Sequence, residues 1–136
     1  MDQNPPLPVV KTFLVCREMF QDAMSGEHIL VGPLQELHVV QAPAVVHVGV
    51  YFEITCGHGN YRPTLQLRDL EEQVVWSQTY EQPFPAQDPL RVAAVAMFHV
   101  GMCIPRLGKY DLVLLVNKEE IARRPLWVSF PNQPNG

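Results

Sequence analysis

Charged side chains are scarce in this sequence, at 18% of its 136 residues. Acidic residues outnumber basic residues by 14 to 10, which leaves a net charge of −4, and Arg123-Arg124 is the only pair of adjacent basic residues. Phosphate recognition normally needs a basic surface. We therefore expect no nucleic-acid partner.

A disulfide framework and a membrane segment are also missing. Cys16, Cys56 and Cys103 are odd in number and widely spaced, which is typical of a reducing compartment. No apolar run approaches the roughly 20 residues of a membrane-spanning helix, and the first residues lack the basic and apolar regions of a signal peptide. We expect a cytoplasmic protein with no membrane partner.

Local enzyme motifs are absent as well. The sequence has no glycine-rich phosphate loop, no nucleophile elbow and no H-E-x-x-H signature. Its carboxylates are dispersed, whereas paired-carboxylate chemistry needs two of them in one cleft. The sequence thus predicts a protein that is not an enzyme and holds no cofactor.

Hydrophobic residues, by contrast, are plentiful at 47%, and 13 prolines divide them into short segments. This combination is typical of strands separated by turns, and the length fits one domain. We predict an all-β fold, an antiparallel β-sandwich of about seven to nine strands over residues 9–130. The proline-rich ends, 1–8 and 131–136, are predicted to be disordered tails.

Alternation is clearest between residues 44 and 55. One face of this predicted strand carries Val46, Val48, Val50, Phe52 and Ile54, and the other carries His47, Gly49, Tyr51 and Glu53. A period of two indicates a strand, because a helix would scatter these apolar side chains around its axis.

Other segments predict strands with defined turns. Residues 28–40 contain Gly32-Pro33, and proline cannot donate a ladder hydrogen bond, so we expect a kinked strand that changes partners midway. Residues 61–70 and 74–80 predict one hairpin. Residues 110–116 and 119–128, joined at Asn117-Lys118, predict another.

Residues 90–104 fit two patterns. Asp88-Pro89 resembles a helix start, and Leu90, Ala93, Ala94, Met97 and Phe98 fit helical spacing. The same stretch alternates as Val92, Ala94, Ala96, Phe98, Val100 and Met102. We favour a short helical turn near 88–94 followed by a strand, with a full helix as the alternative.

The last predicted hairpin resembles the closing strands of immunoglobulin-like modules. Gly108-Lys109-Tyr110 begins it, and in such modules a Gly-x-Tyr forms a tyrosine corner whose hydroxyl bonds to nearby backbone. The resemblance implies an immunoglobulin-like sandwich. The inter-sheet cysteine pair of antibody domains is missing.

Over residues 10–128 the chain resembles a family of small uncharacterised bacterial proteins that form one β-sandwich domain. The matching elements are Thr12-Phe13-Leu14-Val15-Cys16, Leu30-Val31-Gly32-Pro33 and the closing Gly-x-Tyr hairpin. That family has no assigned activity. The resemblance therefore implies a domain of unknown function and transfers no catalytic residue.

Cys56-Gly57-His58-Gly59 is the first candidate site. Cys56 and His58 could hold zinc if His99 and Cys103 converged on them, but the spacing is not that of paired ligands. A glycine-rich turn is the favoured interpretation. A cysteine nucleophile would need a nearby base, and no family signature surrounds any of the three thiols.

Aromatic residues supply the second candidate. His47 and Tyr51 share a strand face that could bind a ligand, and Tyr61, Trp76 and Trp127 could stack on a sugar. The favoured interpretation is that Tyr51 packs under a neighbouring segment while the polar tips around it reach water.

Three functions remain, in order of preference. The first is a non-catalytic protein-interaction or structural module with an unknown protein partner, or a homodimer formed through an edge strand or the apolar segment Leu112–Val116. The second is a small-ligand or carbohydrate binder. The third is a Cys/His metal or thiol enzyme.

Overall fold

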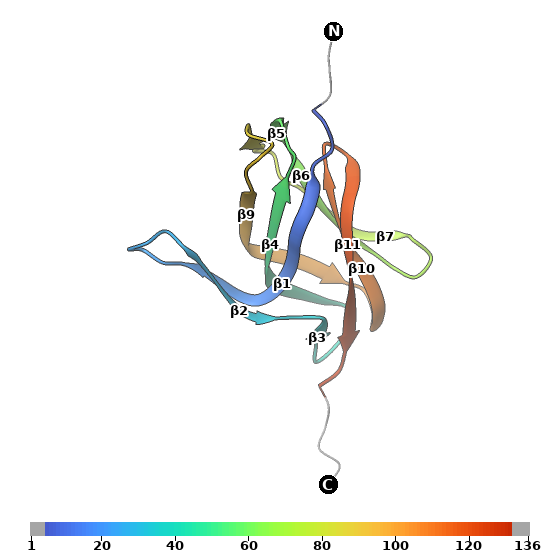
Figure 1. Cartoon of the computed structure of the whole chain (residues 1–136). Helices are drawn as coiled ribbons and strands as arrows, with labels where there is room; N and C mark the ends of the chain where they lie inside the picture. Colours follow the sequence, from blue (N-terminus) through green and yellow to red (C-terminus); the bar gives the residue numbers. More distant parts are fainter. Residues whose placement is uncertain (1–4, 132–136) are drawn as a thin grey trace.

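A computed structural model of the chain describes residues 5–131, and within that range it contains eleven strands and no helix (Figure 1). The described residues thus hold no helix that is long and apolar enough to cross a membrane. The strands are β1 (Val9–Gln21), β2 (His28–Pro33), β3 (Glu36–His38), β4 (Ala44–Thr55), β5 (Gly59–Tyr61), β6 (Pro63–Arg68), β7 (Val74–Thr79), β8 (Phe84–Ala86), β9 (Ala93–Ile104), β10 (Gly108–Val116) and β11 (Glu119–Ser129).

Two larger sheets form a β-sandwich, which confirms the predicted fold class. One has the strand order β2-β1-β4-β9, and the other has the order β3-β11-β10-β6-β7. A small third sheet pairs β5 with β8. All pairings are antiparallel except that of β3 with β11.

The core lies between the two larger sheets. From β4 it contains Val48, Val50, Phe52 and Ile54, all buried as their alternation predicts. The facing strand β10 contributes Leu112 and Leu114. Burying apolar side chains of this size stabilises the fold by about 1.5–3 kcal/mol each.

The kinked segment does change partners. β2 pairs with β1 in the four-stranded sheet, and β3 pairs with β11 in the five-stranded sheet. The switch follows Pro33, which lacks the backbone N–H that would continue the ladder. This segment therefore links the two sheets.

The chain contains more strands than its sequence pattern predicts. Eleven strands replace the predicted seven to nine because β3, β5 and β8 have three residues each. Three residues are too few to show an alternating pattern, so such strands carry no hydrophobic signal.

Within the segment 90–104 the strand is confirmed as β9, which begins at Ala93, and the full helix is wrong. The helical turn predicted near 88–94 is also wrong, because residues 88–91 form a single tight turn. In this turn the Arg91 N–H donates to the Asp88 carbonyl at 3.1 Å, and Asp88 Oδ1 accepts from the Leu90 N–H at 2.9 Å. The predicted alternation is also interrupted. Met97 and Val100 both face the core because β9 has a bulge where it pairs with β4.

The closing hairpin forms as predicted. Asn117 and Lys118 have φ of 49° and 72°, which suits the turn between β10 and β11. The hydroxyl of buried Tyr110 donates to the Arg106 carbonyl at 2.6 Å, the hydrogen bond expected of a tyrosine corner. The immunoglobulin-like topology itself stays a prediction.

The predicted tails overlap the described part of the chain at only a few residues. Residues 1–4 and 132–136 lie outside it. Residues 5–8 contact the domain: Pro8 is buried, and the Pro6 carbonyl accepts from the Tyr61 hydroxyl at 2.7 Å.

Candidate functional site

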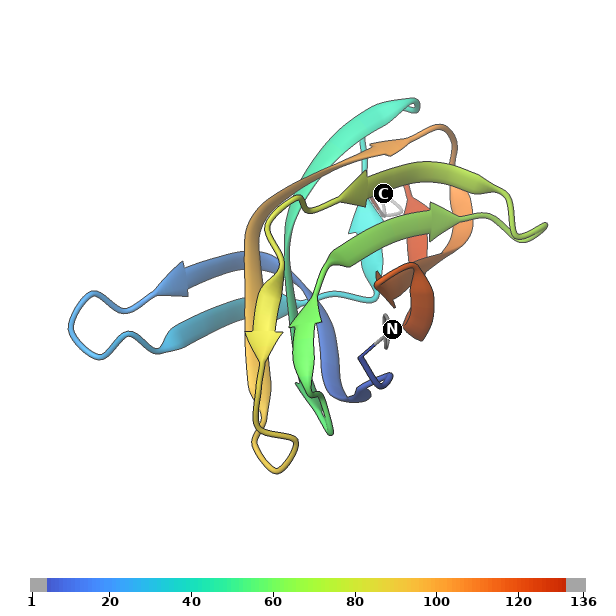
Figure 2. The same cartoon turned by 90° about the horizontal axis from the view of Figure 1, so that it is seen from above.

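A hairpin arm, residues 17–33, leaves the sandwich (Figures 1 and 2). Its two strands are the second half of β1 and the whole of β2. The pairing of β1 with β4 ends at Cys16 and Gly49, and β1 then continues with β2 alone to Gln21 and His28. Both views show the tip of the arm extending beyond the sheets.

One side of the arm packs on the outer face of the four-stranded sheet. Met19 lies over Gly49, so close that a Cβ at Gly49 would overlap the Met19 side chain. The His28 ring meets the rings of Tyr51 and Phe98 edge-on, with centroids 6.0 and 5.9 Å away. These contacts, from Met19 to His28 beside the tip loop, hold the arm on β4 and β9.

The opposite side of the arm is apolar and exposed. Phe20 and Ile29 are cross-strand partners, so their side chains lie on one face, and they are 51% and 45% exposed. At the tip, Met24 is 96% exposed. Exposed apolar side chains that lie together are typical of binding surfaces, and Phe20 and Ile29 are such neighbours on a projecting hairpin.

The tip of the arm is ordered by Asp22. Its Oδ1 accepts from the Met24 N–H at 2.7 Å and the Ser25 N–H at 3.2 Å, and these bonds hold the pKa of Asp22 below its usual value. Gly26, with φ of 76°, closes the turn. The ionised carboxylate therefore fixes the loop that presents Met24.

The sequence did not indicate the arm. It does contain the turn signal Ser25-Gly26. The polar residues before that signal suggested an irregular segment rather than a continuing strand. Charge on the arm is mostly negative, with Glu18, Asp22 and Glu27 against Arg17.

Cys56 and Cys103, two of the zinc ligands considered above, lie at opposite ends of β4, and His99 lies opposite its middle. Cys56 follows β4, whereas Cys103 pairs with Val45 near the start of β4. Val45 and Cys56 are eleven steps apart along an extended strand, or about 35 Å at the usual rise. Among residues 5–131 no group of three or more His, Cys, Asp or Glu side chains could hold a metal ion.

His58 lies in the turn between β4 and β5, and Tyr61 is the last residue of β5. Tyr61 is only 1% exposed, and its hydroxyl accepts from the His58 N–H at 2.9 Å. The His58 ring lies with Nδ1 3.1 Å from the Gln87 carbonyl. The buried ring of Tyr61 is thus unavailable for stacking on a sugar.

Tyr51 is half-buried beneath the arm. Its hydroxyl donates to Glu53 Oε2 at 2.7 Å, and Glu53 Oε1 accepts from the Thr12 hydroxyl at 2.8 Å. Burial and the Glu53 carboxylate raise the pKa of Tyr51 to about 12, and the two hydroxyl donors lower the pKa of Glu53. His47 lies farther along the same face, over Gly101.

The two tryptophans do not form a common surface. Trp76 packs against the core. Trp127 is half-exposed on β11, with the Lys109 Nζ 5.5 Å from its ring centroid. The two rings therefore do not form one platform on which a sugar could stack.

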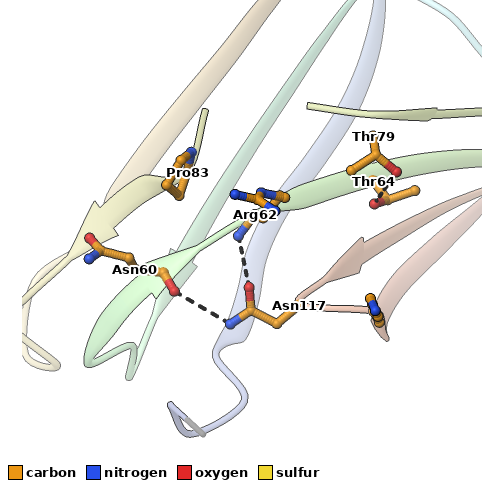
Figure 3. Close-up of a pocket in the computed structure, with 7 residues that line it drawn as sticks. Asn60, Arg62, Thr64, Thr79, Pro83 and Asn117 are labelled. Carbon is orange, nitrogen blue, oxygen red and sulfur yellow. Dashed lines mark hydrogen bonds between the residues drawn. The ribbon is translucent and has the colours of Figure 1, made fainter. Parts of the chain in front are cut away.

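A pocket of about 480 Å³ lies beside the turn between β10 and β11 (Figure 3). It is lined by Asn60, Arg62, Thr64, Thr79, Pro83, Asn117 and Lys118. All of them except Pro83 are polar, and they come from separate segments of the sequence, so no local motif predicts the pocket. The turn residues Asn117 and Lys118 are the only part that the sequence singled out.

Comparison with curated proteins gave no match. Comparison with protein families gave a match over most of the chain, including the arm, both larger sheets and the closing hairpin. This confirms the expectation of a family without assigned activity. Since residues 11–129 match it, the chain belongs to the family of unknown function DUF6941.

Proposed function

We propose that this protein is a non-catalytic protein-interaction module and that the arm is its docking element. The observation that carries the proposal is the exposed apolar surface of Phe20, Met24 and Ile29 on a hairpin that extends beyond the sandwich. Full burial of one such side chain is worth about 1.5–3 kcal/mol. The arm can therefore contribute several kcal/mol to binding.

The partner's chemistry follows from the shape and charge of the arm. A narrow hairpin presents a convex surface, so it fits a groove rather than a flat face. The apolar residues require an apolar floor, and Glu18, Asp22 and Glu27 favour a basic rim. We propose a protein partner with a basic-rimmed apolar groove.

Paired variants test the arm. Partners are captured from an extract of the native cell with three proteins. These are the wild type, the arm variant Phe20→Ser/Met24→Ser and the control Leu90→Ser. Leu90 is as exposed as Met24 but lies outside the arm. A captured partner is then purified, and its affinity for all three proteins is measured by calorimetry.

We expect the arm variant to bind the purified partner at least tenfold more weakly than wild type, and the control to bind like wild type. Equal affinity for wild type and the arm variant would overturn the proposal. Both arm residues are exposed, so the arm variant should unfold at the same temperature as wild type.

A homodimer is the second candidate, and of the two surfaces that the sequence suggested we favour an edge strand over the segment Leu112–Val116. Leu112–Val116 lies on β10, which is central in its sheet, and the outward side chain of Val113 is 0% exposed. We propose β9 instead. It is an edge strand of twelve residues without a charged side chain, and edge strands usually carry charges that prevent pairing.

A further inference from the structure

The pocket shown in Figure 3 lies where four segments meet at one end of the five-stranded sheet. Arg62 precedes β6, Thr79 ends β7, Pro83 belongs to the crossing segment, and Lys118 lies in the β10–β11 turn. The volume of about 480 Å³ is within the range of small-molecule sites.

Asn117 joins the walls of this pocket. Its Oδ1 accepts from the Arg62 N–H at 2.9 Å, its Nδ2 donates to the Asn60 carbonyl at 3.4 Å, and its own N–H donates to the Arg62 carbonyl at 3.0 Å. Figure 3 shows the two side-chain bonds. The pocket is therefore held open by hydrogen bonds that already exist without a ligand.

The pocket carries positive charge that no carboxylate of residues 5–131 pairs with. Four other arginines form ion pairs, namely Arg68, Arg91, Arg106 and Arg123. Arg62 and Lys118 form none with any residue of 5–131, and no carboxylate is among the lining residues. In a protein of net charge −4, two cations at one pocket that pair with no carboxylate in the described part of the chain favour an anion.

Hydroxyl groups supply a further donor. The Thr64 and Thr79 oxygens lie 3.0 Å apart, and one hydroxyl donates to the other. The second hydroxyl proton has no acceptor among the side chains and backbone of the described residues. A ligand oxygen in the pocket could accept it, because a hydroxyl can turn its proton toward a new partner.

We propose that this pocket binds a small organic molecule through an oxyanion, a phosphate or a carboxylate. Arg62 offers a planar pair of N–H donors, Lys118 adds a point charge, and one threonine hydroxyl completes the set. The volume leaves room for more than the oxyanion, so the rest of the ligand lies against Pro83 and Asn60. This site is separate from the arm, and the proposal does not depend on the proposed docking function.

Nuclear magnetic resonance titration tests the site on the full chain. The probes are inorganic phosphate, glucose 6-phosphate and citrate, with glucose as the uncharged control and sodium chloride to match ionic strength. The variant Arg62→Gln/Lys118→Gln removes both charges. Arg91→Gln removes an exposed arginine outside the pocket.

We expect glucose 6-phosphate or citrate to shift the amide signals of Asn60, Thr64 and Thr79 and to saturate, at least tenfold more tightly than inorganic phosphate. The pocket variant should bind that probe at least tenfold more weakly, and Arg91→Gln should bind it like wild type. Since the replaced side chains are exposed, the pocket variant should keep the wild-type spectrum elsewhere.

Three results would overturn the proposal. Amide-signal shifts that grow linearly with probe concentration and never saturate would mean that no site exists for any of the probes. Equal affinity for inorganic phosphate and both organic anions would mean an adventitious ion only. Unchanged binding by the pocket variant would place the anion elsewhere on the surface.

Discussion

Single residues fix the corners of the sandwich, and Tyr110 is the clearest case. Its ring is buried at the start of β10, and its hydroxyl holds the preceding loop through the Arg106 carbonyl. We expect Tyr110→Phe to lower the free energy of unfolding by about 1–2 kcal/mol, because the hydrogen bond is lost while the ring still packs.

Urea unfolding measures this loss. Tyr80→Phe is the matched control, since the Tyr80 ring packs against the core and no hydrogen bond of its hydroxyl is present in residues 5–131. The control should change stability by less than half as much. Equal losses for the two variants would contradict a role for the corner hydrogen bond.

Arg123 is the centre of an ion-pair network on the outer face of the five-stranded sheet. It contacts Glu72 at 2.8 Å, Asp111 at 3.1 Å and Glu120 at 2.8 Å. Hydrogen bonds from Arg123 lower the pKa of Glu72 and of Glu120 from 4.5. These two carboxylates therefore favour the folded state when they are ionised.

The lowered pKa values of Glu72 and Glu120 set how the free energy of unfolding changes with pH. A carboxylate with a lower pKa in the folded state adds stability above its unfolded pKa and loses it as pH falls through the folded pKa. The stability difference between wild type and Arg123→Gln should thus be largest at pH 7 and shrink toward pH 3. Urea unfolding at both values checks this, and a constant difference would contradict it.

At the scale of elements, the arm depends on a close approach between two strands. Because Met19 occupies the space above Gly49, we expect Gly49→Ala to displace the arm and cost about 1–3 kcal/mol. In a Met19→Ala background the same substitution should cost less. Urea unfolding of the four proteins gives the coupling energy.

Gly101→Ala is the control for this cycle. Gly101 lies on β9, where an added Cβ would be 3.3 Å from Nε2 of the exposed His47 side chain, which can move aside. We expect Gly101→Ala to lower the free energy of unfolding by much less than Gly49→Ala does. If Gly49→Ala costs the same with and without Met19, the packing of the arm on β4 has no energetic consequence.

The same elements show what a sequence can predict. The strand over 44–55 was predicted with the bounds that β4 has, because one of its faces is buried and the other is not. The arm was not predicted, since Met19 is the only buried residue of 17–33, and one buried side chain makes no alternating pattern. In β9 a bulge reverses the pattern midway, and a bulge leaves no local signal.

The candidate sites were harder to predict for a related reason. Cys56 and His58 are neighbours in sequence, yet a turn that ends a strand need not approach any other ligand. The pocket collects Asn60, Thr79 and Lys118 from three segments. Such a set becomes visible only when strand order is known, because the five-stranded sheet brings β6, β7 and the β10–β11 turn together.

At the scale of the whole molecule, the sandwich and the arm divide the thiols into two classes. Cys16 is buried under the base of the arm, and burial raises its pKa, whereas Cys56 and Cys103 are exposed. We expect a disulfide reagent at pH 8 to react quickly with two thiols of the native protein. The third should react only after unfolding in urea, and three fast thiols would contradict this burial.

At the scale of assembly, the free edge of β9 is the interface that we propose for a homodimer. Beyond β4, this strand has no backbone partner among the described residues, and it contains neither a charge nor a proline. A second copy can pair with it antiparallel without repulsion between like charges. We therefore expect the chain to self-associate as its concentration rises.

Light scattering after size exclusion measures the mass. Wild type should rise from 15.4 kDa toward twice that value, whereas Ala94→Lys/Ala96→Lys should stay at 15.4 kDa, because lysines on an edge strand oppose pairing. Gln78→Lys places a lysine on β7, the edge strand of the other sheet, and should associate like wild type. A wild-type mass of 15.4 kDa at every concentration, or a lysine variant that still associates, would show that β9 is not the interface.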